Sequence, residues 1–193
     1  MLKFGNTFVN YGGTYLDGWS AMIKPNFNEV QIGNQIWTSE NLNINDGNSG
    51  IVTKQVAANG INYGNQNFYT LPAAQRVADR IYGWHLPTKD EWNTLFNSVG
   101  GWDYAARQLK SSAGWASGNG VDAYSFNLKP LGYVTGTTLY QAGISTYVWN
   151  NHYYTDEWGT WYGQYIFSSA DSPKFTEYTN PNYYLFQVRL VKD

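Results

Sequence analysis

The side chains that could carry acid-base or metal chemistry in this chain are two histidines, His85 and His152, and two adjacent acids, Asp156 and Glu157. Two histidines are too few for a histidine-rich metal site, and His85, next to Trp84 before an expected helix, is interpreted as structural. Glycoside hydrolysis needs two carboxylates that flank one bond, whereas neighbouring residues on a strand point in opposite directions. Because the chain also lacks cysteine and a Gly-x-Ser-x-Gly nucleophile turn, we do not expect an enzyme.

Residues 147–186 are instead rich in aromatic and small polar side chains. About a third of them are Trp, Tyr or Phe, against 18% in the whole chain, and most others are Asn, Ser, Thr, Gly or Asp. Rigid aromatic rings combined with adaptable hydrogen-bonding groups are typical of binding surfaces. The alternative is that these aromatics form the core of a β-sandwich or barrel. Strand alternation allows both at once, since successive side chains face opposite ways.

Length and charge limit the other function classes. With 193 residues, the chain is expected to form one domain of ordinary size. Charged residues make up 13% and the net charge is −2, so no basic stripe is available for nucleic acid. We find no apolar run long enough for membrane insertion and no recognisable signal peptide. The expected location is a virion, or the cell surface or extracellular space if a leader has been removed.

Turn and helix signals indicate the elements that position these residues. Residues 1–29, rich in Gly, Asn and aromatics, are expected to form short strands or an extended arm. The pair Gly33-Asn34 between apolar residues predicts a β-hairpin. The turn-rich segment 43–66 is interpreted as loop or irregular hairpin. A first helix is predicted with Pro72 in its first turn.

A second helix is predicted to begin after Thr88. Thr88 as N-cap and Glu91 at the third helical position can satisfy each other's free backbone amides, which is a capping box. Gly100 is expected to end this helix in a left-handed conformation. After it we expect loops and short strands, and a half-buried final strand over residues 186–191. The order of elements predicts an α+β fold, with two helices plus antiparallel β-sheets.

Three segments resemble a known family: residues 32–42 (IGNQIWTSENL), 83–92 (GWHLPTKDEW) and 186–193 (FQVRLVKD). In this order they are similar to the bacterial FISUMP family, the major paralogous domain. The LPTKDEW core is also similar to the helix-opening motif of formylglycine-generating enzymes, whose chemistry the lack of cysteine excludes. Both groups are associated with the C-type lectin fold. The resemblance implies a C-type lectin-like ligand-binding domain at residues 30–193, after an N-terminal arm or assembly segment at residues 1–29.

The likeness extends to the variable proteins of diversity-generating retroelements, whose C-terminal ligand-binding face is diversified through adenine-rich codons. Randomised adenines in Asn codons give residues such as Asn, Tyr, His, Ser, Thr and Asp, but not Trp or Glu. In this chain such residues alternate with Trp149, Glu157, Trp158 and Trp161, which would form a fixed scaffold. By this resemblance the candidate ligand-binding residues are Asn150, Asn151, His152, Tyr153, Tyr154, Tyr162, Tyr178, Asn182, Tyr183 and Tyr184.

These observations favour a non-catalytic ligand- or receptor-binding protein, namely a retroelement-diversified phage or prophage receptor-binding protein. The alternative is a bacterial surface adhesin or lectin without diversification, whose aromatics stack on sugar rings. A third hypothesis is a purely structural virion or envelope component. The expected partners are a cell-surface protein or glycan, and further copies of the chain in a homo-oligomer or in a virion or surface assembly.

No cofactor is expected. Calcium needs six to eight oxygen ligands, several of them carboxylates. The run Trp149-Asn150-Asn151 is only faintly similar to the Trp-Asn-Asp calcium motif of sugar-binding lectins, since the aspartate is replaced and no Glu-Pro-Asn partner is present. Calcium-dependent sugar binding is therefore not expected, and the sequence leaves a structural ion open.

Overall fold

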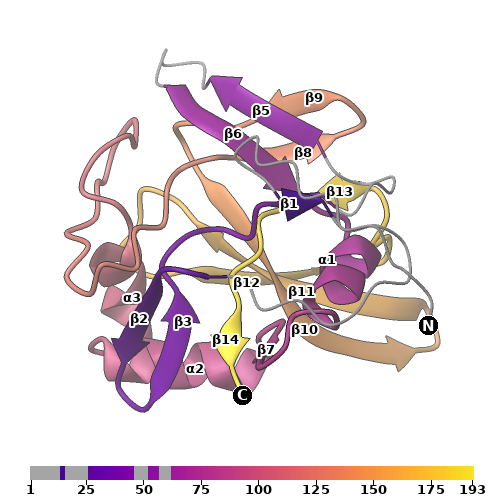
Figure 1. Cartoon of the computed structure of the whole chain (residues 1–193), viewed down its shortest axis with the longest axis horizontal. Coiled ribbons are helices and arrows are strands. Elements are labelled where there is room, and N and C mark those ends of the chain that lie inside the picture. The colour runs from indigo at the N-terminus through magenta and orange to yellow at the C-terminus, as the bar shows by residue number, and fades with distance from the viewer. Residues whose placement is uncertain (1–13, 16–25, 46–51, 57–61) are drawn as a thin grey trace, which may run out of the picture.

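A computed structural model of the chain describes residues 14–15, 26–45, 52–56 and 62–193 (Figure 1). The helices in this part are α1 (Leu71–Ala78), α2 (Lys89–Ser98) and α3 (Trp102–Leu109). The strands are β1 (Thr14–Tyr15), β2 (Glu29–Ile32), β3 (Gln35–Thr38), β4 (Ile44–Asn45), β5 (Val52–Val56), β6 (Asn62–Phe68), β7 (Trp84–His85), β8 (Tyr133–Thr135), β9 (Thr138–Tyr140), β10 (Thr146–Asp156), β11 (Gly159–Phe167), β12 (Lys174–Tyr178), β13 (Tyr184–Leu185) and β14 (Val191–Lys192). In the described residues no helix is long and apolar enough to span a membrane.

Three antiparallel sheets make up most of the β-structure, in the strand orders β2-β3-β14-β7, β13-β8-β9 and β10-β11-β12. A β5-β6 hairpin and a short parallel β1-β4 pair accompany them. In the first sheet, β14 lies between β3 and β7, with Val191 opposite both Trp37 and His85. The end of the chain is thereby fixed against its earlier strands. The predicted α+β class with antiparallel sheets is confirmed.

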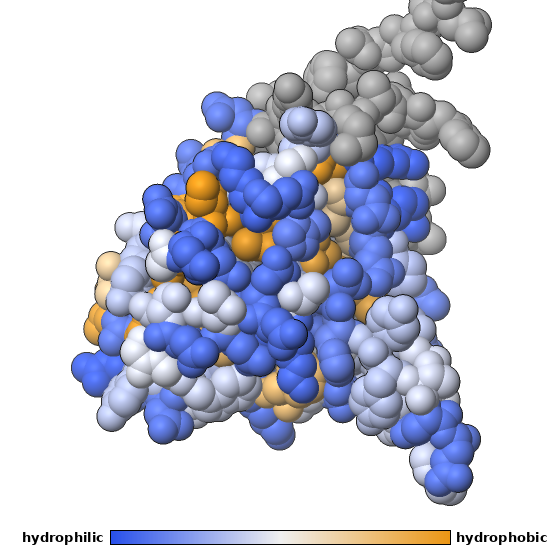
Figure 2. Space-filling model, turned by 90° about the horizontal axis from the view of Figure 1, so that it is seen from below, coloured by the Kyte–Doolittle hydropathy of each residue, from blue (hydrophilic) through white to orange (hydrophobic). Residues whose placement is uncertain are grey.

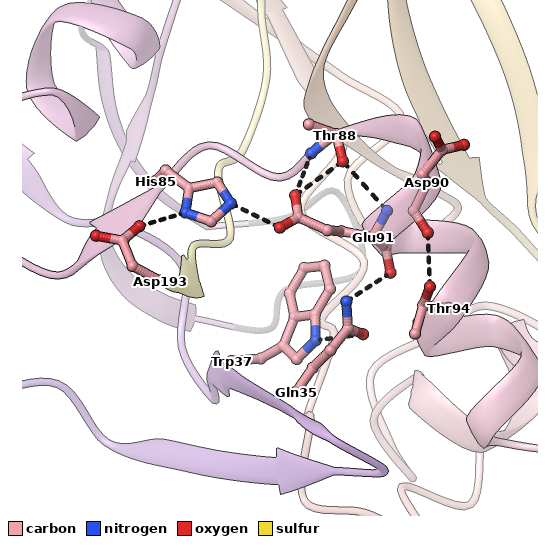
Figure 3. A network of polar contacts seen from close by, with 8 residues as sticks. All are labelled: Gln35, Trp37, His85, Thr88, Asp90, Glu91, Thr94 and Asp193. Atoms are coloured by element: carbon pink, nitrogen blue, oxygen red, sulfur yellow. Dashed lines mark hydrogen bonds and ion pairs between the residues drawn. The ribbon is translucent and has the colours of Figure 1, made fainter.

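The two sharpest local predictions are also confirmed. Gly33 and Asn34 form the turn between β2 and β3, and Gly33 has a φ of +60°, which favours glycine. At the start of α2, Glu91 N donates to Thr88 Oγ1 at 3.2 Å, and Thr88 N donates to Glu91 Oε2 at 2.8 Å (Figure 3). This capping box satisfies amides that the first helical turn would otherwise leave unpaired.

The expectation of two helices was wrong, because α3 follows α2 almost directly. Its N-cap is Gly101, which makes no side-chain cap, so the usual start signal is missing. Its buried residues are Ala105, Ala106 and Leu109, a stripe in which two members are small. The first predicted helix exists as α1, with Thr70 as N-cap and Pro72 in the first turn.

The segment interpreted as loop or irregular hairpin contains β4, β5 and most of β6, and β5 pairs with β6 through a register shift, so the irregular-hairpin alternative is confirmed. The prediction for the final strand needs correction. Residues 186–191 do not form a half-buried strand, because all of them are buried, including Gln187 and Arg189. The expected N-terminal arm lies outside the described residues except for β1 and residues 26–29, so its role stays a prediction.

The sheet β10-β11-β12 separates two hydrophobic clusters at its inner end. On one face, Tyr147 and Trp149 pack with α1 residues such as Val77. On the other face, Val148 and Tyr165 pack with residues of α2 and α3. Alternation along β10 explains this division, since neighbouring side chains point to opposite faces. The inner half of the sheet is thus held on both sides, and it anchors the outer half.

Candidate ligand-binding surface

Half of the candidate residues lie on the outer half of the β10–β11 hairpin, namely Asn151, His152, Tyr153, Tyr154 and Tyr162. Residues 146–150 of β10 are buried, whereas every residue from 151 to 158 is exposed except the half-buried His152. The hairpin extends away from the helices in Figure 1 and forms the projecting, mainly pale arm at the lower right of Figure 2. A rigidly anchored strand pair therefore holds aromatic side chains out in solvent.

A bulge separates the buried and exposed halves of β10. The register changes from Trp149 opposite Gln164 to Tyr153 opposite Tyr162, so residues 150–152 face a single residue, Gly163. Asn150 closes the bulge, because its Oδ1 accepts a hydrogen bond from His152 N at 2.9 Å. A Cβ atom at Gly163 would lie 2.8 Å from this Oδ1 and 2.9 Å from the Phe175 ring. Glycine is needed there for the bulge to close.

One face of the surface is a continuous set of tyrosines, here called the tyrosine row. Tyr153 pairs with Tyr162 across β10 and β11, and Tyr162 pairs with Tyr178 across β11 and β12. The Tyr178 ring lies 4.7 Å from the Tyr184 ring, which lies 4.8 Å from the Tyr183 ring. The row continues through Tyr133 and Tyr140, with Tyr133 5.8 Å from Tyr184 and 5.4 Å from Tyr140, where the rings are stacked.

Some rings of the tyrosine row pack against the hydrophobic core, and others are exposed to solvent. Tyr133, Tyr162, Tyr178 and Tyr184 are partly buried against the hydrophobic cluster of α1. Tyr153, Tyr183 and Tyr140 expose 64%, 55% and 43% of their surface. Burial, together with the neighbouring Tyr184 hydroxyl, raises the pKa of Tyr133 and Tyr178. Both hydroxyls therefore stay protonated and can donate hydrogen bonds at neutral pH.

The tip of the hairpin, residues 154–161, carries a second aromatic group. The rings of Tyr154 and Trp161 are stacked, 6.4 Å apart with an angle of 13° between their planes. Asp156 Oδ1 accepts hydrogen bonds from Trp158 N at 2.9 Å and from Trp161 Nε1 at 3.0 Å. Trp158 itself is 78% exposed. The Asp156 side chain thus orders the turn.

His152 lies on the face opposite the tyrosine row. Its Nε2 is 3.3 Å from Glu177 Oε1, and its ring contacts Phe175 edge-on with centroids 5.7 Å apart. Lys89, from the start of α2, places its ammonium 4.1 Å from the centre of the Phe175 ring. This face therefore offers both charges beside aromatic rings, although it presents fewer tyrosines than the other face.

The three asparagines differ in their placement. Asn150 is 0% exposed, and its Nδ2 has no hydrogen-bond partner among the described residues, so it does not lie on the exposed face. Asn151 is exposed, donates from its backbone to Pro87 O at 2.7 Å and accepts from Gln75 Nε2 at 3.1 Å. Asn182 is exposed in the turn before β13. Only Asn151 and Asn182 are thus available to a surface ligand.

Sequence reasoning missed Tyr133 and Tyr140, which lie before the aromatic-rich tract. They join the tyrosine row because β8 pairs with both β9 and β13, with Tyr133 opposite Tyr140 and Tyr184 opposite Thr135. The short β8–β9 hairpin around Gly136 was the available signal, since its apolar and aromatic strands flank a two-residue turn. In the described residues, no group of three or more His, Asp or Glu side chains is arranged to hold a metal ion.

The fold and surface define a mixed α+β domain whose last strands display clustered aromatics. The chain matches the model of the Fibrobacter succinogenes major domain over residues 30–192, which is most of its length. It therefore belongs to this family, and the FISUMP resemblance of the sequence is confirmed. No curated protein and no solved structure matches the chain.

Proposed function

We propose that this domain is a non-catalytic binding module that uses the tyrosine row and the hairpin tip to attach to a cell-surface protein or glycan. The observation that carries the proposal is the tyrosine row, in which half-buried rings support exposed ones across several strands. Tyrosines held in this way lose little entropy on binding and offer both apolar area and hydroxyl groups. Large aromatic side chains left in solvent are characteristic of interaction sites.

We further propose that the domain has a C-type lectin-like fold. Two features support the assignment: the last strand, β14, pairs between β3 and β7, and the aromatic surface lies on the two other antiparallel sheets. In such an arrangement the sheet that contains β14 stabilises the domain, and the loops and outer strands of the other sheets are available to a ligand. Binding through several copies in a homo-oligomer or in a virion or surface assembly would convert weak contacts into strong attachment.

Retroelement diversification of this surface is part of the proposal. Asn151, Tyr153, Tyr154, Asn182 and Tyr183 are exposed residues of the kind that adenine randomisation permits. Asn150 is permitted by the same codon rule, but it is buried and closes the bulge. A reverse transcriptase gene beside a near-copy of the gene's 3′ end is the expected genomic setting. Isolates that vary at Asn150 as freely as at Tyr153 would count against this part.

A glycan-binding adhesin without diversification is the second candidate. The stacked Tyr154 and Trp161 rings favour it, because their planes are nearly parallel and Tyr154 is 40% exposed, so the tip presents a flat aromatic face of the size of a sugar ring. A glycan array separates this candidate from a protein receptor. Binding to defined glycans that is lost in Trp161→Ala supports the adhesin, and binding only to protein extracts supports the first candidate.

The test of binding compares Tyr153→Ala and Tyr183→Ala with the parent protein on a panel of bacterial cells. Central aromatic contacts are worth about 2 kcal/mol or more, so adhesion should fall at least about 30-fold. Tyr104→Ala on α3 is the matched control, since Tyr104 is 56% exposed and lies outside the tyrosine row. Melting temperatures should be alike in all variants. Unchanged adhesion in both row variants would support a purely structural role instead.

A further inference from the structure

A second polar surface lies where the segment after β3, the loop before β8 and the segment before β14 meet. A hollow of about 150 Å³ opens there, lined by polar side chains that include Ser39, Glu40, Asn41 and Lys129. This volume holds about five waters at roughly 30 Å³ each, or one small polar ligand. None of the lining residues lies on β10, β11 or β12, so the hollow is independent of the tyrosine row.

Arg189 lines the hollow and is fixed in place, although it is only 1% exposed. Its Nε donates to Asn41 Oδ1 at 2.7 Å, and its Nη1 donates to Thr38 O and Phe126 O at 2.9 and 2.8 Å. The guanidinium also lies 4.6 Å from the centre of the Phe126 ring. Its orientation is therefore set by the fold before any ligand arrives.

One N–H of the Arg189 guanidinium has no hydrogen-bond partner among the described residues, and the group is positively charged. Nη2 donates to Asn127 O at 3.2 Å, so four of the five guanidinium hydrogens have partners in the described part of the chain. Burial lowers the pKa of Arg189 to about 9, partly offset by the charges of Glu40 and Asp122, so the group is positive at neutral pH. No carboxylate of the described residues forms an ion pair with it. The fifth guanidinium hydrogen, on Nη2, thus has no carboxylate acceptor among the described residues, and an anion in the hollow would supply one.

The rim supplies one further cation and several neutral groups. The Lys129 ammonium makes no ion pair or hydrogen bond with the described residues. Glu40 is an acceptor, and Asn28 Nδ2 donates to its Oε1 at 3.2 Å. The Ser39 hydroxyl donates to Asn28 O at 3.1 Å and can still accept, and the side-chain amides of Asn41 and Asn127 also line the hollow. The hollow thus offers positive charge for an acid group, and acceptors and amides for hydroxyl groups.

We propose that this hollow binds an acidic sugar residue, a single ring that carries one carboxylate and several hydroxyls. The carboxylate lies toward Arg189 and Lys129, and the hydroxyls bond to Glu40 and the amides. A neutral sugar would leave the Lys129 ammonium and the fifth guanidinium hydrogen without an anionic acceptor, and a simple anion would leave Glu40 and the amides unused. The site is separate from the proposed attachment through the tyrosine row and does not depend on it.

The experiment is an NMR titration of the full chain with galacturonic acid, galactose and sodium sulfate at matched ionic strength. We expect galacturonic acid to bind with a dissociation constant on the order of millimolar, typical of one sugar ring. Amide signals of residues 39–41 and 127–129 should shift. Galactose and sulfate should each bind at least about tenfold more weakly, because galactose lacks the carboxylate and sulfate lacks the hydroxyl groups.

Variants assign the interaction to the hollow and separate it from the tyrosine row. Lys129→Gln should weaken galacturonic acid about two- to fivefold, the usual effect of one exposed charge. Tyr153→Ala, which tests the proposed attachment surface, should bind galacturonic acid like the parent. The inference is overturned if galactose or sulfate binds as well as galacturonic acid, if Lys129→Gln has no effect, or if the shifts fall on β10 and β11.

Discussion

His85 Nε2 lies 2.7 Å from Glu91 Oε1 at the start of α2 (Figure 3). On the other side of the ring, His85 Nδ1 lies 2.6 Å from Asp193 Oδ1, just after β14. Carboxylates only accept hydrogen bonds, so both ring nitrogens donate when the histidine is protonated. These contacts join β7 and the nearby capping box of α2 to the end of β14, which lies about a hundred residues further along the chain.

The stability of the protein should depend on pH through His85. Burial lowers the pKa of His85, but the hydrogen bonds and charges of Asp193 and Glu91 outweigh it, and the net pKa is raised. A raised folded-state pKa stabilises the fold below the ordinary histidine pKa, and this contribution is lost as pH rises through the folded value. In urea unfolding, His85→Gln should therefore cost more free energy at about pH 5.5 than at about pH 8.5.

Asp193→Asn is the matched variant, because it removes one of the two carboxylate charges and keeps a side-chain acceptor. It should reduce the pH dependence without abolishing it. If the free energy of unfolding of His85→Gln follows pH as the parent does between these two values, His85 does not couple the two carboxylates to stability.

Removing the N-cap of α2 should destabilise the fold. In Thr88→Ala, the amide of Glu91 loses its acceptor, and Glu91 loses the hydroxyl that donates to its Oε2 at 2.9 Å. Loss of an N-cap costs about 1 kcal/mol in unfolding free energy, measured by urea denaturation. Thr94→Ala is the control, since the Thr94 hydroxyl donates only to Asp90 O within the helix. If both variants lose the same free energy of unfolding, the N-cap contributes no more to stability than the hydrogen bond of Thr94 within the helix.

The confirmed predictions rest on signals confined to a few neighbouring residues. Thr88 and Glu91 alone form the capping box of α2, and Gly33 and Asn34 form the β2–β3 turn. Both depend on local backbone geometry, so no distant part of the chain can overrule them easily. The family motif could be recognised for the same reason, because its segments are short and stand in a fixed order.

What could not be predicted depends on partners far along the chain. Gln187 and Arg189 alternate with apolar residues, a pattern that predicts exposure to solvent, yet both side chains are buried. Gln187 Oε1 accepts from Thr146 Oγ1 at 2.6 Å, and Arg189 donates to the carbonyls of Thr38 and Phe126. Polarity alone does not reveal such partners. Asn150 was misplaced for the same reason, since its burial depends on the bulge opposite Gly163.

Lys110 should be one of the most sensitive positions in the domain, although its side chain is charged. It is 0% exposed, and its Nζ donates to Gly118 O and Ser168 O at 2.6 Å and to Ala170 O at 3.0 Å. Lys110→Met keeps the length of the side chain but leaves these carbonyls without their donor. The free energy of unfolding should fall by about 2 to 5 kcal/mol.

The control for this position is Lys129→Met, at a half-buried lysine whose ammonium has no partner among the described residues. It should change the free energy of unfolding by no more than about 0.5 kcal/mol. A Lys110→Met variant as stable as Lys129→Met would mean that water replaces the ammonium at the three carbonyls without cost.

The bulge beneath the projecting hairpin should tolerate no side chain at Gly163. In Gly163→Ala, the new Cβ would meet Asn150 Oδ1 at 2.8 Å and the Phe175 ring at 2.9 Å, and both neighbours are held in the sheet. Overpacking of this kind costs about 1 to 3 kcal/mol. Since the bulge sets where Tyr153 and Tyr154 stand, ligand binding should weaken as well, even at temperatures where the variant stays folded.

Thr160→Ala is the matched substitution on the same strand, outside the bulge. Its hydroxyl lies 3.0 Å from that of Thr155, an exposed cross-strand contact worth about 0.2 to 1 kcal/mol. Stability is read from urea unfolding and the hairpin's geometry from the chemical shifts of residues 150–156. If Gly163→Ala keeps both the stability and these shifts, the bulge adapts to a methyl group, and the exposed tyrosines are not positioned by it.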